Sequence, residues 1–157
     1  MDDLRIYNYA LSGSDIKSLY DMGSVASPKT GCTQHQIPPT GQWTSSWFGT
    51  GISVTSGQTI SITASGTVQP STGRDLFCGP DGTFAVDYWQ TSYTFRSDWG
   101  HAAMIARIGA GDPIFIGTST TFTASTGGEL YLGIIDTDVG NNSGGFVVDV
   151  CLGQAST

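Results

Sequence analysis

Four side chains with a carboxylate or amide oxygen fall within seven residues near the end of the chain: Asp136, Asp138, Asn141 and Asn142, in LGIIDTDVGNNSGGF (132–146). Glycines at 140, 144 and 145 allow this segment to curl sharply and turn its oxygens inward. Calcium takes six to eight oxygen ligands, from carboxylates, amides and backbone carbonyls. The segment is therefore a candidate calcium site. Asp, Asn and Gly are also the common residues of β-turns, so a turn without metal fits the spacing equally well.

A catalytic site could be assembled from Cys78, His101 and Asp98, as nucleophile, base and orienting carboxylate, or from two acidic residues as in a glycosidase. Nothing in the sequence fixes the geometry of either set. Acidic residues outside turns are sparse, and the chain has only two histidines. The sequence therefore favours a protein that is not an enzyme.

The three cysteines, Cys32, Cys78 and Cys151, are too few and too scattered for a zinc site. In an oxidising compartment Cys32 and Cys151 could join the two ends of the domain and leave Cys78 unpaired. Three small buried thiols are the alternative.

Charge and hydropathy limit the partners. Six basic and thirteen acidic residues give a net charge of −7, which repels nucleic acid. No apolar run approaches the roughly 18–20 residues that span a bilayer, so membrane insertion is not expected. Met1-Asp2-Asp3 is unlike a basic signal-peptide start, and we expect a piece of a longer secreted protein whose signal lies upstream.

Short alternating segments define the fold class. Ile52 and Val54, then Ile60, Ile62 and Ala64, alternate with Ser and Thr, and the Ser-Gly-Gln turn between the two runs predicts a hairpin. The later segments AAMIARIG, PIFIG, TTFTAS, ELYLGIID and GFVVDVCL are bounded by glycine or polar turns. The sequence predicts an all-β protein, an antiparallel β-sandwich of the jelly-roll kind.

Three regions are predicted along the chain. Residues 1–23 form a short strand and an amphipathic helix, and resemble the C-terminal end of a laminin-G-like or concanavalin-like jelly-roll domain. Residues 24–41 are rich in Pro, Thr, Gly and Gln, a composition typical of a linker. The β-sandwich itself is predicted over residues 42–153.

Several motifs occur together in a recognisable order: GQTISITASGTVQP, AAMIARIGAGDPIFIG and ELYLGIIDTDVGNNSGGFVVDV. Over Trp43 to Gly153 the chain resembles the PA-IL-like family of bacterial galactophilic lectins. The resemblance implies a small β-sandwich in which one calcium ion binds two neighbouring hydroxyls of a galactose-type sugar. It implies the following metal ligands: Asp136 by its carboxylate, Asn141 and Asn142 by their amide oxygens, Asp138 by its carbonyl, and a carbonyl of Pro70 or its neighbour Gln69.

The sugar site implied by the resemblance uses Asp136, Thr137 and Asn141. The segment 81–101 is longer than in the family and carries Tyr88, Trp89, Tyr93, Phe95 and Trp99. Aromatic faces stack on pyranose rings, so we expect Trp89 and His101 to contact the sugar. Alternatively, the loop folds back and buries its rings on the sandwich.

The sequence thus favours a calcium-dependent lectin domain for galactose-containing glycans. One site binds a monosaccharide weakly, so useful avidity would need a homo-oligomer or a tethered partner. The competing hypothesis is a sandwich that calcium stabilises and that binds no sugar.

Overall fold

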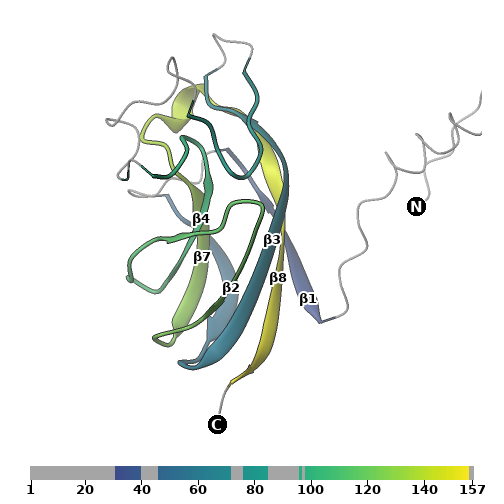
Figure 1. Ribbon diagram of the computed structural model, residues 1–157, viewed down its shortest axis with the longest axis vertical. Helices are drawn as coiled ribbons and strands as arrows, with labels where there is room; N and C mark the ends of the chain where they lie inside the picture. The colour runs from purple at the N-terminus through teal and green to yellow at the C-terminus, as the bar shows by residue number, and fades with distance from the viewer. Residues whose placement is uncertain (1–30, 40–45, 72–75, 85–95, 97, 156–157) are drawn as a thin grey trace, which may run out of the picture.

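The computed structural model describes residues 31–39, 46–71, 76–84, 96 and 98–155, and these form two antiparallel sheets packed face to face (Figure 1). The first sheet has the order β1 (Cys32–Ile37), β8 (Ser143–Ala155), β3 (Gln58–Gln69) and β6 (Ser119–Thr123). The second has the order β2 (Phe48–Val54), β7 (Gly128–Ile134), β4 (Met104–Ile108) and β5 (Ile114–Phe115). The predicted all-β sandwich is confirmed.

The core lies between the sheets because alternate residues of each strand point inward. Ile60 and Ile62 of β3 are fully buried, and so are Leu130 and Leu132 of β7. Each such side chain contributes about 1.5–3 kcal/mol by leaving water. A smaller apolar cluster covers the outer face of the second sheet, where Trp47, Trp99 and Phe115 pack over Ala103, Ile105 and Ile135.

The sandwich begins earlier than the predicted boundary at residue 42. Residues 32–37, expected to be linker, form β1 and pair with β8 from Cys32 opposite Cys151 to Ile37 opposite Phe146. A disulfide joins Cys32 to Cys151, which confirms the pairing considered from the sequence, and Cys78 is a free buried thiol. Composition was misleading here because the polar Gln and Thr residues of β1 belong to an edge strand.

The predicted hairpin over 52–64 is wrong. The tight turn exists, since Gln58 N–H donates to the Thr55 carbonyl at 3.1 Å and Gly57 has a φ of 83°. This turn carries the chain from one sheet to the other: β2 pairs with β7, while β3 pairs with β8 and β6. Alternation shows which face of a strand is buried, but it does not identify the strand's partner.

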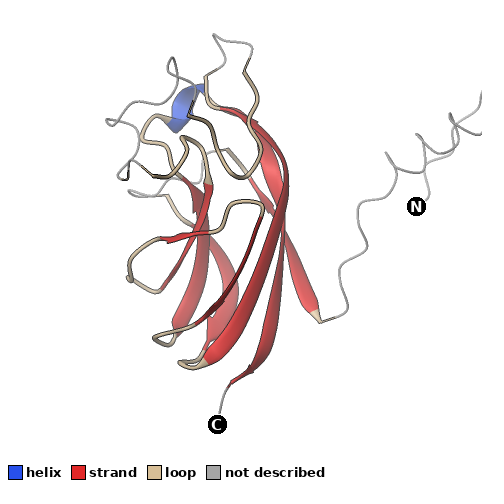
Figure 2. Cartoon of the chain, in the orientation of Figure 1, coloured by secondary structure: helices blue, strands red, loops and turns tan. Residues whose placement is uncertain are grey.

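Helix is confined, in the described ranges, to η1 (Val139–Asn141), a single turn among the loops at one end of the sandwich (Figure 2). No described helix is long and apolar enough to cross a membrane. Residues 1–23 and the first part of the predicted linker lie outside the described residues.

Candidate functional site

The predicted oxygen cluster lies in the connection between β7 and β8. Ile135 continues the strand by donating its N–H to Ala103 O at 3.0 Å, and the chain then turns through η1 before β8 starts at Ser143. Asp136, the first residue of this turn, is only 1% exposed. The structure therefore places a carboxylate in the interior, at the base of the loop.

Asp136 accepts hydrogen bonds from both sides of the loop. Its Oδ1 accepts the backbone N–H of Asp138 at 2.9 Å, and its Oδ2 accepts Asn142 Nδ2 at 2.9 Å. His101 Nε2 lies 3.2 Å from Oδ1. Burial opposes ionisation, but the adjacent His101 imidazole and the hydrogen bonds from Asp138 and Asn142 outweigh it and lower the pKa of Asp136. The buried group is therefore a carboxylate near neutral pH.

The side-chain oxygens of Asn141 and Asn142 accept no hydrogen bond, although the side-chain nitrogens of both residues donate one. Asn141 Nδ2 donates to Asp138 Oδ2 at 3.2 Å, and Asn142 Nδ2 donates to the Pro39 carbonyl at 3.1 Å. The Oδ1 atoms of both asparagines are buried and have no hydrogen-bond partner. Buried acceptors are normally paired, because leaving one unpaired costs about 1–3 kcal/mol. Two unpaired amide oxygens in the same loop as a buried carboxylate fit a hard cation such as calcium.

The end of β3 borders the same loop, as the resemblance implied. Gln69 is paired with Ser143 across the sheet, and Ser143 Oγ donates to Gln69 Oε1 at 3.0 Å. Pro70 follows and is buried. Asp138 is exposed and Thr137 is partly exposed at the mouth of the loop. The structure therefore brings the predicted residues of the 136–142 loop and the end of β3 into one region.

A close crossing of two turns holds His101 beneath Asp136. Thr83 and His101 exchange backbone hydrogen bonds of 2.9 Å. A Cβ at Gly82 would lie 2.7 Å from His101 O, and one at Gly100 would lie 2.8 Å from Asp81 O, so both turns need glycine. The next residue, Ala102, adopts a φ of 60°, a conformation that costs an L-residue about 1–2 kcal/mol. The strained φ angle of Ala102 therefore lies directly beside His101 in the chain.

Of Trp89 and His101, the predicted sugar contacts outside the 136–142 loop, the structure describes His101 alone. Trp89 lies outside the described residues, as do Tyr88, Tyr93 and Phe95. His101 is described and is 4% exposed, so its ring faces Asp136 and does not form an open wall. Trp99 packs against Phe115 with ring centroids 5.5 Å apart. For this one ring, the contact agrees with the alternative in which the loop packs its aromatic rings on the sandwich.

The hypothetical catalytic set is not assembled. Cys78 Sγ donates to Val68 O at 3.3 Å, and burial raises the pKa of this thiol to about 11, so the nucleophilic thiolate is disfavoured. Asp98 accepts two hydrogen bonds from Arg96, at 2.7 and 2.8 Å. Within the part of the chain that the structure describes, no three His, Cys, Asp or Glu side chains converge on one point. A metal ion bound at the 136–142 loop would therefore need amide and carbonyl oxygens as ligands in addition to the Asp136 carboxylate.

Sequence reasoning missed Pro39, whose carbonyl accepts Asn142 Nδ2. It was assigned to the linker, so its contact with the loop was not expected. The pairing of Cys32 with Cys151 was the signal that could have found it. An antiparallel register from that disulfide places Ile37 opposite Phe146, and so brings Pro39 near Asn142.

No family model matches the chain, and neither does any curated protein sequence. Among solved structures, the chain is similar to the EclA N-terminal domain, described as a PllA-like lectin. The TM-score is 0.56 and the sequence identity 18%, over 80% of this chain and 100% of that one. At this identity the similarity shows the fold alone: the chain is a β-sandwich of the same architecture as that domain.

Proposed function

We propose that this protein is a carbohydrate-binding domain that holds a galactose-type sugar through a calcium ion in the 136–142 loop. The observation that carries the proposal is the pair of buried, unpartnered oxygens, Asn141 Oδ1 and Asn142 Oδ1, in the same loop as the buried Asp136 carboxylate, which Asn142 contacts. The lectin-like fold supports the same class of function.

The residues of the loop have distinct roles in this proposal. Asp136 provides the negative charge, and the two amide oxygens and backbone carbonyls near Asp138 and Pro70 complete a set of oxygen ligands. When bound, calcium would supply an electrophilic centre with coordination positions open to two vicinal hydroxyls. Thr137 and Asn141, which are partly exposed, would hydrogen-bond the sugar.

The Cys32–Cys151 disulfide indicates the kind of compartment in which the protein works. Disulfides persist in oxidising environments and are rare in the cytosol. The Cys32–Cys151 bond therefore supports the proposal that this domain works outside the cell, as an accessory module that binds galactose-containing glycans. A sandwich that calcium only stabilises remains the competing function, because Asp136 is buried and closes its own loop.

Isothermal titration of galactose and N-acetylgalactosamine, with calcium and after chelation, tests the proposal. We expect binding that requires calcium and is lost in Asp136→Ala. A rise in melting temperature on adding calcium, with no binding of either sugar or of a wider glycan set, would favour the purely structural role. If calcium neither binds nor stabilises the protein, the proposal is wrong.

A further inference from the structure

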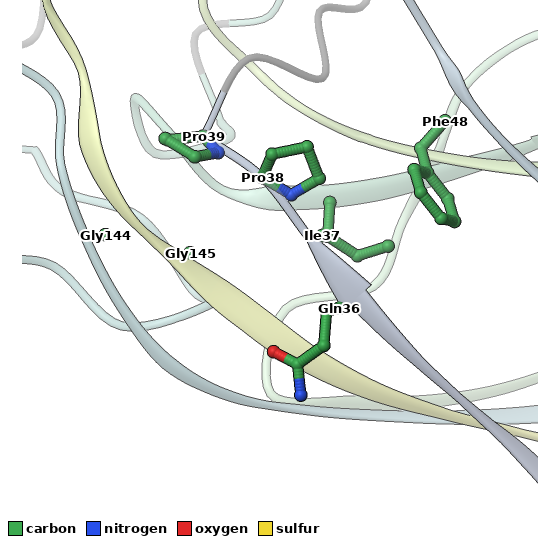
Figure 3. A pocket seen from close by; sticks show the side chains of 7 residues that line it. All are labelled: Gln36, Ile37, Pro38, Pro39, Phe48, Gly144 and Gly145. Carbon is green, nitrogen blue, oxygen red and sulfur yellow. The ribbon is translucent and has the colours of Figure 1, made fainter.

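An open groove of about 610 Å³ lies beside the candidate calcium loop, where the edge strands β1 and β2 of the two sheets come together (Figure 3). Its volume is within the range of about 300–1,000 Å³ that is usual for small-molecule sites. The lining residues come from the end of β1, the start of β2 and the start of β8: Gln36, Ile37, Pro38, Pro39, Phe48, Gly144 and Gly145.

The walls of the groove are held rigidly. β1 is tied to β8 by six paired positions and by the Cys32–Cys151 disulfide. A Cβ at Gly145 would lie 2.7 Å from Ile37 O, so this glycine lets the two strands approach closely at the groove. The rings of Pro38 and Pro39 fix their own φ angles. A preformed site loses little conformational entropy when a ligand binds.

The uncharged, mostly apolar residues that line the groove favour a neutral ligand. None of the seven residues is charged, and Gln36 alone has a polar side chain, so an anionic ligand would find no cation there. The chain's net charge of −7 opposes anions further. The two proline rings and the partly exposed Phe48 ring offer apolar surface, which suits the C–H face of a neutral pyranose. Neither proline has an N–H that would need a partner.

The groove is continuous with the candidate calcium loop. The carbonyl of Pro39, a lining residue, accepts Asn142 Nδ2 at 3.1 Å. Gly144, another lining residue, follows Asn142 by two positions in the chain. A glycan held by its terminal sugar at the loop could therefore extend into the groove without leaving the protein surface.

We propose that this groove is a second subsite, which binds the neighbouring neutral pyranose of a glycan whose terminal sugar is held at the 136–142 loop. The inference rests on the proposed function and goes beyond it, because it assigns the ligand as an oligosaccharide. Recognition then depends on two sites, with calcium selecting the terminal sugar and the groove selecting what is linked to it.

Titration calorimetry with calcium, comparing methyl galactosides with neutral galactose-terminated di- and trisaccharides in α and β 1→3, 1→4 and 1→6 linkages, tests the subsite. We expect at least one linkage to bind about tenfold tighter than the monosaccharide. A matched glycan whose second residue is a uronic acid should show no such gain. If no extended neutral sugar binds more than about twofold tighter, the subsite does not exist.

A substitution in the groove tests whether the tighter binding of the oligosaccharide comes from this site. Pro38→Glu adds a carboxylate at an exposed lining position. We expect it to remove the oligosaccharide advantage and leave methyl galactoside affinity unchanged, while losing no more stability than the small amount that one proline ring contributes. Pro113→Glu, between β4 and β5 at the opposite edge of the second sheet, is the matched control and should keep the advantage. An advantage that survives in Pro38→Glu would overturn the proposal. Failure of the unaltered protein to bind any monosaccharide would instead count against the calcium-lectin function.

Discussion

His101 Nε2 lies 3.2 Å from Asp136 Oδ1, and both side chains are almost completely buried. The two residues come from different connections, since His101 precedes β4 and Asp136 follows β7. Their backbones are also linked, because Ala102 N–H donates to Ile135 O at 2.7 Å. The imidazole therefore fixes the carboxylate that the proposed calcium site depends on, and it does so from beneath the loop.

His101→Leu should weaken calcium binding by roughly 10–100-fold, the usual effect of removing a group that orients a metal ligand. His101→Gln can still donate a hydrogen bond and should recover most of the affinity. Calcium titration measures both, and thermal unfolding in chelator reports separately on the metal-free fold. Equal affinity in His101→Leu and the unaltered protein would show that the imidazole does not position Asp136.

Asn142→Asp should make the protein more dependent on calcium. Asn142 Nδ2 is 2.9 Å from Asp136 Oδ2, so the substitution replaces a hydrogen bond with two facing carboxylates. Without metal, we expect a loss of about 1–3 kcal/mol in the free energy of unfolding. A bound cation would offset this repulsion, so calcium should raise the melting temperature more than it does in the unaltered protein.

Asn142→Ala is the control for that substitution, since it removes the same amide without adding charge. It should also destabilise the loop, but calcium should not restore its stability. Differential scanning fluorimetry across a calcium series distinguishes the two variants. If calcium leaves the melting temperature of Asn142→Asp unchanged, no ion binds at this loop.

Reduction of the Cys32–Cys151 disulfide should lower the free energy of unfolding by about 2–5 kcal/mol, because the bond closes a long loop of the unfolded chain. Urea unfolding with and without reductant measures the difference. The double variant Cys32→Ser/Cys151→Ser should be as unstable as the reduced protein and insensitive to reductant. Cys78→Ala should keep the reductant effect. The double variant retains only Cys78, so a reductant effect in it would mean that the reductant does not act through the Cys32–Cys151 bond.

Much of the fold follows from local pattern, and the chief errors were in pairing. Alternation at Ile60 and Ile62 identified a half-buried strand, and the structure confirms it. Alternation could not show that β3 lies beside β8 and not β2, because pairing depends on contacts distant in the chain. Composition placed β1 in a linker, although its six residues pair with β8 and complete the first sheet.

The oxygen cluster could be predicted because its members are neighbours in sequence, and their types alone suggest the chemistry. His101 could not be placed, because its position depends on a positive φ at Ala102 and a backbone crossing that only Gly82 and Gly100 allow. The groove depends on Pro38, Pro39 and Phe48 meeting across two sheets. No short window of sequence carries that information.

His35 should make stability depend on pH. Its Nε2 is buried and has no hydrogen-bond partner, and its ring meets Phe48 edge-on with centroids 5.9 Å apart. Burial lowers the pKa of His35 below 6.5, so the unfolded chain takes up a proton first as the pH falls. The stability gained from a neutral His35 is present above pH 6.5 and is lost as the pH falls from there towards the folded-state pKa.

Urea unfolding between pH 5.5 and 7.5 should therefore show a free energy of unfolding that rises with pH, with a slope of at most about 1.4 kcal/mol per pH unit from this one group. His35→Gln cannot titrate in this range, so its profile should be flatter. His101→Gln provides the comparison, as it removes the other histidine and leaves His35 in place. A slope that persists unchanged in His35→Gln would show that neutral His35 contributes nothing measurable to the pH dependence.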